Sequence, residues 1–116
     1  MTVHATPGRH VLADFRGVAP GLLTDAQALE RQMTAAAHAA GAQVLSAHFH
    51  HFGAGAGVTG VILLSESHIS IHSWPEHRYA ALDIFMCGAA RPERALERLR
   101  AALAPDTLRV TTVDRG

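Results

Sequence analysis

Hydroxyl and imidazole side chains are concentrated in the segment Glu66–His72, which reads ESHISIH. A simple hairpin turn would favour Asn-Gly or Asp-Gly here, so this composition indicates a role beyond turning the chain. One interpretation is a solvated strand edge, and the other is a serine, Ser67, that attacks the carbonyl of the residue before it. The two-residue period of a strand puts Ser67 and His72 on opposite faces. Attack would therefore require a bend at Glu66-Ser67, and a strained peptide there would assist it.

The basic residues carry a second chemical signal. All ten are arginine, and the chain has no lysine. It therefore has no side-chain amine that could form a Schiff base with a substrate carbonyl or anchor pyridoxal phosphate. Imine chemistry with an amine substrate would need a carbonyl made from the chain itself or one supplied by a cofactor that is held in another way.

The elements that must position these residues can be read from hydrophobic periodicity, caps and turn residues. Thr24 and Asp25 can cap a first helix that continues to Ala40, and Gly41 ends it. Arg91-Pro92 opens a second helix that runs to Leu103. Strands are expected at Val11–Phe15, Val44–Phe52, Val58–Leu64, His68–Trp74, Tyr79–Met86 and Leu108–Val113. This order predicts an α+β fold, a two-layer α/β sandwich in which two helices cover one face of a largely antiparallel sheet.

Length and charge limit the classes of partner. A chain of 116 residues fits a single domain over 1–116, and its small core would gain from a subunit interface, so we expect an oligomer. Ten basic residues balance ten acidic ones, which gives no field that attracts nucleic acid or an anionic membrane. The single cysteine, Cys87, cannot form an internal disulfide, and Met1–His10 lacks the pattern of a leader, so we expect a cytoplasmic protein.

Four motifs resemble the prokaryotic S-adenosylmethionine decarboxylase proenzyme family, and weaker similarity extends over nearly the whole chain. They are Gly57-Val58-Thr59-Gly60, Ser65-Glu66-Ser67-His68, Ile71-His72-Ser73-Trp74-Pro75-Glu76 and Tyr79-Ala80-Ala81-Leu82-Asp83-Ile84-Phe85-Met86-Cys87-Gly88. The resemblance implies self-cleavage between Glu66 and Ser67, into a β chain of residues 1–66 and an α chain of residues 67–116. Ser67 would become a pyruvoyl group, which agrees with the absence of lysine.

The resemblance also implies roles for the residues around the cut. Ser67 would add to the Glu66 carbonyl to give an ester, and His72 would be the proton acceptor of this processing reaction. Thr59 occupies the place of a family serine whose hydroxyl steadies the adduct. In turnover the pyruvoyl group would form a Schiff base with the substrate amine, and Cys87 would be the proton donor.

The expected substrate is S-adenosylmethionine, whose decarboxylated product serves spermidine biosynthesis. By resemblance, Glu76 would hold the ribose hydroxyls and Phe52 would stack on the adenine. The chain departs from the family pattern in the glycine- and alanine-rich loop after Phe52, at His77-Arg78 and at Met86. Family members are dimers with active sites near the interface, so a homodimer of cleaved protomers is expected.

Three alternatives stay open on the sequence. A pyruvoyl enzyme of the same family could instead decarboxylate arginine or ornithine. The nine histidines could form a metal-binding module in which His48, His50, His68 and His72 converge on zinc, although this spacing is a weak signal and our main interpretation includes no metal. The chain could also be an uncleaved homologue that regulates an active subunit.

Overall fold

The computed structural model describes residues 7–116. The first six residues of the Met1–His10 segment, on which the expected absence of a leader depends, lie outside the described residues. The strands are β1 (Gly8–Arg16), β2 (Val44–His51), β3 (Val58–Leu64), β4 (Ser67–Trp74), β5 (Tyr79–Cys87) and β6 (Thr107–Arg115). The helices are α1 (Pro20–Leu23), α2 (Ala26–Ala39), α3 (Pro92–Leu103) and the 3-10 turn η1 (Pro75–His77). Within residues 7–116, no helix is long and apolar enough to span a membrane.

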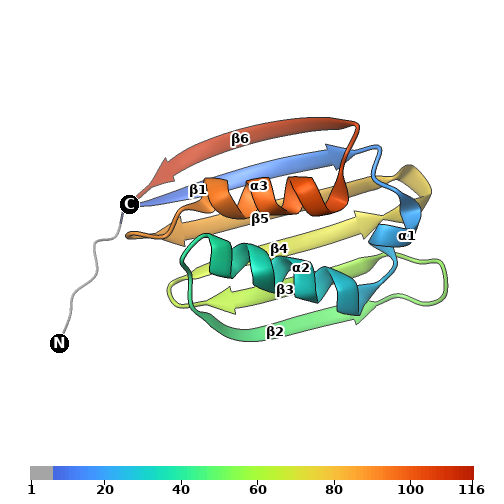
Figure 1. Ribbon diagram of the computed structural model, residues 1–116, viewed down its shortest axis with the longest axis horizontal. Helices are drawn as coiled ribbons and strands as arrows, with labels where there is room; N and C mark the ends of the chain where they lie inside the picture. Colours follow the sequence, from blue (N-terminus) through green and yellow to red (C-terminus); the bar gives the residue numbers. More distant parts are fainter. Residues whose placement is uncertain (1–6) are drawn as a thin grey trace.

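The six strands form one antiparallel sheet in the order β2-β3-β4-β5-β1-β6. Helices α2 and α3 lie side by side on one face of this sheet, as Figure 1 shows. The predicted two-layer α+β sandwich is therefore confirmed. The predicted elements are all present, and α1 and η1 are short helical turns in segments where the sequence indicated only turns.

The core lies between the helices and the covered face of the sheet. On β5 the residues Ala80, Leu82, Ile84 and Met86 are buried, and the residues between them are partly exposed. This two-residue alternation is what a sheet with one buried face requires. Helix α2 begins where the Asp25 carboxylate accepts a hydrogen bond from the Ala28 N–H at 3.0 Å, and its buried residues are Leu29, Met33, Ala36 and Ala37.

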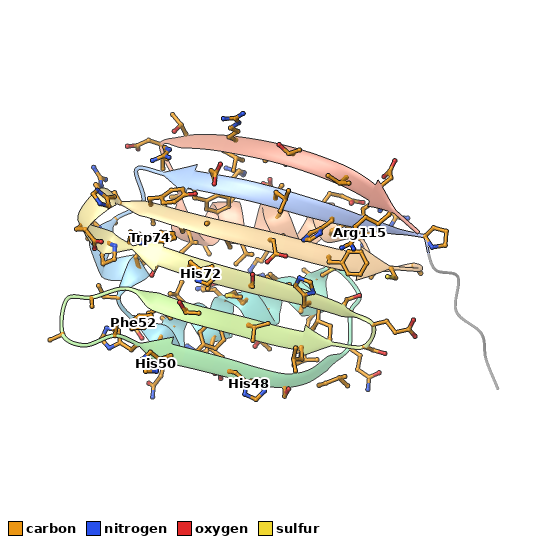
Figure 2. All side chains as sticks on the ribbon, turned by 180° about the vertical axis from the view of Figure 1, so that it is seen from behind. His48, His50, Phe52, His72, Trp74 and Arg115 are labelled. Carbon is orange, nitrogen blue, oxygen red and sulfur yellow. The ribbon has the colours of Figure 1, made fainter. Side chains whose placement is uncertain are left out.

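The opposite face of the sheet, here called the open face, carries polar and aromatic side chains, as Figure 2 shows. Strand register places on it, among others, Thr59 of β3, His72 of β4 and Asp83 of β5. Both helices that could cover a six-stranded sheet lie on the other side, so this face is available for chemistry or for a partner.

The connection between β3 and β4 is a tight turn at Ser65 and Glu66. Glu66 has a positive φ of 56°, in the left-handed region that residues other than glycine rarely adopt. The bend expected at Glu66-Ser67 is therefore present. It places Ser67, the first residue of β4, at the end of the sheet where the α2–β2 and β5–α3 connections also lie.

Candidate active site

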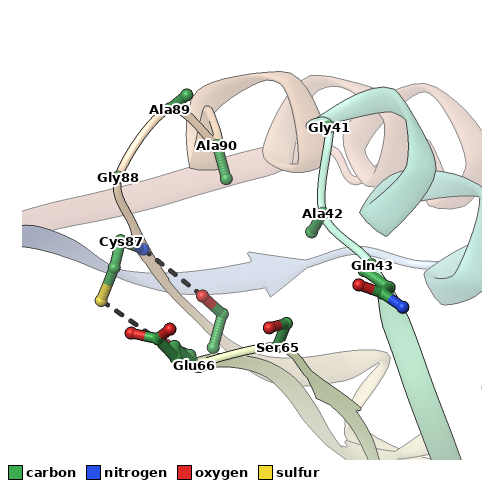
Figure 3. Close-up of a pocket in the computed structure, with 10 residues that line it drawn as sticks. Gly41, Ala42, Gln43, Ser65, Glu66, Cys87, Gly88, Ala89 and Ala90 are labelled. Carbon is green, nitrogen blue, oxygen red and sulfur yellow. Dashed lines mark hydrogen bonds between the residues drawn. The ribbon is translucent and has the colours of Figure 1, made fainter. Parts of the chain in front are cut away.

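Three connections meet at this end of the sheet and form a pocket, shown in Figure 3. They are the α2–β2, β3–β4 and β5–α3 connections. The pocket is lined by Gly41, Ala42, Gln43, Ser65, Glu66, Ser67, Cys87, Gly88, Ala89 and Ala90. Most of these side chains are small, which leaves space beside the Glu66-Ser67 peptide bond.

Cys87 contacts both sides of that peptide bond. Its thiol donates a hydrogen bond to the Glu66 carbonyl oxygen, with the sulfur 3.5 Å from the oxygen. Its backbone N–H donates to Ser67 Oγ at 3.3 Å, and both contacts are drawn in Figure 3. The hydroxyl that could attack and the carbonyl that would be attacked are thus held by one residue.

Strand pairing explains why a residue twenty positions later reaches the turn. In the β4–β5 register His68 faces Phe85, so Cys87, two residues further along β5, lies beside the turn that precedes β4. Gly8 of β1 lies next to Cys87, and a Cβ at Gly8 would be 3.1 Å from the sulfur and 2.9 Å from the Met86 carbonyl oxygen. Glycine at this position therefore leaves the room that the Cys87 thiol occupies.

The other expected site residues gather at the opposite end of the sheet. Thr59 Oγ1 and His72 Nδ1 share a hydrogen bond of 3.1 Å on the open face. Phe52 follows β2, is 62% exposed and contacts His50 with ring centroids 4.6 Å apart. Glu76 is exposed in the first turn of η1. Figure 2 shows Phe52 and His72 toward the same end of the molecule, far from Arg115 at the other end.

Within one chain, the structure does not bring these two groups together. Ser67 and His72 are five residues apart on the same strand, β4. At about 3.3 Å per residue, this spacing separates their Cα atoms by roughly 16 Å. The bend at Glu66 does not shorten this distance, because it precedes both residues. The pocket therefore contains Glu66, Ser67 and Cys87, whereas Thr59, His72, Glu76 and Phe52 lie elsewhere.

A polar cluster that the sequence did not predict lies on the open face, close to the pocket. Asp83 Oδ2 accepts hydrogen bonds from His10 Nε2 at 2.6 Å and from His68 Nε2 at 2.8 Å, and Asp83 Oδ1 accepts one from the Ser70 hydroxyl. Burial raises the pKa of Asp83, but the bonds from Ser70, His10 and His68 outweigh it and hold that pKa below its ordinary value. Alternation within each strand predicts which of its residues share a face, but it does not predict which strands are neighbours.

The four histidines of the alternative metal-binding interpretation do not converge. His68 bonds to Asp83, His72 to Thr59, and His48 to the Ser46 hydroxyl at 3.2 Å. The reason is strand order, since β2 and β4 are separated by β3. The histidines of β2 in this set are therefore not adjacent to those of β4, although they share the open face.

Among residues 7–116, ligand atoms close enough to share an ion occur at His10, His68 and Asp83. However, the Arg115 guanidinium lies 3.3 Å from His10 Nδ1 and can only donate to it. Nδ1 is therefore the acceptor, and Nε2 carries the proton that it donates to Asp83. A protonated nitrogen is not a metal ligand, so the contacts describe a hydrogen-bonded network.

Comparison with known proteins gives one consistent result. A family model described as S-adenosylmethionine decarboxylase matches residues 9–116. The chain is 41% identical over 110 residues to the S-adenosylmethionine decarboxylase proenzyme of Thermotoga petrophila, covering 94% of this chain and 84% of the relative. It is 40% identical over 111 residues to the proenzyme of Bacillus velezensis, covering 96% of this chain and 87% of the relative.

A solved structure is similar as well. The adenosylmethionine decarboxylase of Aquifex aeolicus superposes with a TM-score of 0.87 at 33% sequence identity. The match covers 94% of this chain and 90% of that protein. Sequence and fold therefore agree over almost the whole length of the chain.

Proposed function

This chain belongs to the S-adenosylmethionine decarboxylase family, and we propose that it cleaves itself between Glu66 and Ser67 and then decarboxylates S-adenosylmethionine. The observation that carries the proposal is the pair of contacts from Cys87, whose thiol and N–H bond the Glu66 carbonyl and the Ser67 hydroxyl. The product would serve spermidine biosynthesis. A single free cysteine agrees with a protein that acts in the reducing cytoplasm.

The first step exchanges an amide for an ester. Ser67 Oγ adds to the Glu66 carbonyl carbon, and the carbon–nitrogen bond breaks while the hydroxyl proton passes to the Ser67 nitrogen. The Cys87 thiol already donates to the carbonyl oxygen, which gains negative charge in this step. The left-handed conformation of Glu66, with φ of 56°, adds strain that cleavage would release.

The second step needs a base. His72 would take the proton from the Ser67 α-carbon, and the Glu66 carboxylate would leave from the β-carbon as a double bond forms. Addition of water and loss of ammonia then give the pyruvoyl group, with no oxidant or reductant. When His72 Nδ1 donates to Thr59 Oγ1, Nε2 is the basic nitrogen, and the Thr59 hydroxyl proton is free to steady the adduct.

His72 and Thr59 must then come from a second copy of the chain. Roughly 16 Å separates Ser67 from His72 in one protomer, which is far beyond hydrogen-bond reach. A twofold axis perpendicular to the strands, between two open faces, would bring the pocket end of one sheet opposite the His72 end of the other. Such an interface is isologous and would create two equal sites, each built from both protomers. We therefore propose a homodimer of cleaved protomers.

A pyruvoyl group would supply a ketone that condenses with the substrate amine and accepts the electrons released as carbon dioxide leaves. The residues present fit this group, because residue 67 opens into a pocket whose lining is half glycine and alanine. The Cys87 thiol lies 3.5 Å from the carbonyl oxygen of Glu66, which precedes residue 67, so it could return a proton to the former α-carbon of the substrate.

Binding of the nucleoside would also fall to the second protomer. Phe52 offers an exposed ring to which a nucleobase can stack, and the Glu76 carboxylate can accept hydrogen bonds from two ribose hydroxyls. Both residues lie at the His72 end of the sheet. They would therefore reach the pocket of the partner together with His72.

Intact mass and a substrate assay test this function. We expect two fragments, residues 1–66 and 67–116, with the smaller one blocked at its amino end, and a Ser67→Ala variant that stays whole. Carbon dioxide should be released from carboxyl-labelled S-adenosylmethionine. Release from arginine or ornithine alone would contradict the proposed substrate, and a wild-type chain that remains uncleaved would contradict the whole proposal and favour a regulatory role.

A further inference from the structure

Self-cleavage would make residue 67, at the start of β4, a new chain end. Before the cut, the turn through Ser65 and Glu66 holds Ser67 in place. After the cut, residue 67 is a chain end, and chain ends fray unless side chains or backbone contacts hold them. Residue 67 would then carry the reacting ketone, and catalysis is sensitive to displacements of about 1 Å.

The residue next to the cut is anchored by its side chain. His68 Nε2 donates to Asp83 Oδ2 at 2.8 Å, across to β5. Asp83 in turn accepts from His10 Nε2 of β1 at 2.6 Å and from Ser70. The carboxylate is largely covered, with 21% of its side chain exposed. Hydrogen bonds to an ionised carboxylate are stronger than neutral ones, so this anchor links β4 firmly to two other strands.

Further contacts fix the orientation of the two imidazoles. The Phe85 ring packs against both, with centroids 5.5 Å from His10 and 5.9 Å from His68. Arg115 donates to His10 Nδ1, which leaves the proton on Nε2 facing Asp83.

We infer that His10, Asp83 and His68 form an anchor that keeps residue 67 in position once the Glu66-Ser67 bond has been cut. His68 and Asp83 are therefore positioning residues, which act through residue 67. The inference depends on the proposed self-cleavage. It implies that the anchor is redundant in the uncleaved chain and necessary in the cleaved one.

Two isosteric or ring-conserving variants test this difference. Asp83→Asn places an NH₂ group opposite at least one imidazole or hydroxyl donor, and His68→Phe keeps the ring on Phe85 but removes the donor. Each is made in the wild-type chain and in the uncleavable Ser67→Ala chain. Asp14→Asn is the matched control, because Asp14 also lies on the open face and accepts a bond, from Tyr79 at 2.5 Å, but far from the cut.

Hydrogen exchange of the segment 68–72, followed by mass spectrometry, is the main measurement. In the cleaved protein, Asp83→Asn and His68→Phe should speed exchange of this segment by roughly tenfold or more, as expected for loss of a charge-assisted bond. In the Ser67→Ala background the same changes should speed exchange of this segment no more than they speed exchange of the rest of the sheet, because only global unfolding is affected there. Asp14→Asn should leave the segment unchanged in both.

Enzyme kinetics provides an independent measurement. Both variants should cleave as completely as wild type and keep its KM, while kcat falls by about three- to tenfold, because the ketone is misplaced but the nucleoside contacts remain. Equal acceleration of exchange in cleaved and uncleaved chains, or no acceleration in either, would refute the anchor. Failure of the proposed function is distinct, since the wild-type chain would then show no cleavage at all.

Discussion

In the proposed mechanism, both self-cleavage and decarboxylation depend on Cys87. Its thiol contacts the Glu66 carbonyl oxygen, and its N–H contacts Ser67 Oγ. The N–H contact survives any substitution other than proline, whereas the thiol proton is lost with the side chain. Substitutions at this residue can therefore separate the two contacts chemically.

We predict that Cys87→Ala lowers decarboxylation per cleaved chain by about 100-fold or more, the usual range for loss of a general acid. Cys87→Ser, which keeps a weaker acid in the same place, should retain part of this rate. Turnover is measured as release of labelled carbon dioxide and divided by the pyruvoyl content found by titration with phenylhydrazine. Wild-type turnover per pyruvoyl group in Cys87→Ala would show that another residue donates the proton.

Asp83 predicts how stability depends on pH. Its pKa in the folded chain lies below the ordinary value of 3.8, which it regains on unfolding. It therefore stabilises the fold above about pH 3.8, and this contribution is lost as the pH falls through the lower folded pKa. The groups that face it are His10 of β1, His68 and Ser70 of β4, and Arg115 of β6 behind His10.

The measurement is urea unfolding in the Ser67→Ala background, where the chain is whole. The difference in unfolding free energy between Asp83 and Asp83→Asn should be largest near neutral pH and shrink progressively below about pH 4. Asp14→Asn provides the comparison for a carboxylate on the same face. A difference that grows toward acid would mean that Asp83 is protonated, not ionised, in the folded chain.

At the scale of elements, local sequence signals were sufficient to predict most helix and strand boundaries. The strand predicted at Val58–Leu64 matches β3, and the second helix matches α3. Alternation, caps and proline positions act within a few residues of one another, so the sequence contains them. Helix α1 (Pro20–Leu23) gave no such signal, because a helix of four residues has too few internal hydrogen bonds to form alone.

A tertiary contact holds α1 in place. The Ser73 hydroxyl, which is 7% exposed, donates to the Leu23 carbonyl oxygen at 2.8 Å and accepts from the Val58 N–H at 2.9 Å. It thus ties the end of α1 to the start of β3 from within β4. The Leu23 carbonyl and the Val58 N–H belong to buried residues, so water does not easily replace the hydroxyl if it is removed.

Ser73→Ala should therefore destabilise the fold by about 1–3 kcal/mol, the cost of leaving buried polar groups without partners. Urea unfolding of the uncleavable chain gives this value, and Thr111→Ala on the exposed strand β6 should change it by less than about 0.5 kcal/mol. Equal effects of the two substitutions would mean that solvent replaces the Ser73 contacts.

At the scale of the molecule, strand order was the property that the sequence did not reveal. Strand β1 lies between β5 and β6, the last two strands of the chain. This long-range pairing brings His10 to Asp83, and no periodicity within a segment encodes it. The sequence did predict the layers and the opposite faces of Ser67 and His72. The expected bend at Glu66-Ser67 does not bring these two residues together, because it precedes both of them.

The distance between Ser67 and His72 within one chain leads to a prediction about dimer assembly. A Ser67→Ala chain lacks the proposed nucleophile, and a His72→Ala chain lacks the proposed base, so neither should cleave when it is produced alone. If each pocket takes its base from the other protomer, a mixed dimer contains one complete pair: Ser67 of the His72→Ala chain and His72 of the Ser67→Ala chain.

Co-expression of the two variants, with a distinguishing tag on one of them, is the test. The His72→Ala chain should be cleaved in the mixed dimers, which are half of the dimers when the chains mix evenly, and the Ser67→Ala chain should stay whole. Purified dimers carrying both chains, resolved on a denaturing gel, report this directly. If the His72→Ala chain stays whole in these dimers while wild type cleaves, the base must act within its own chain. A movement of β4 that the roughly 16 Å spacing makes very costly would then be required.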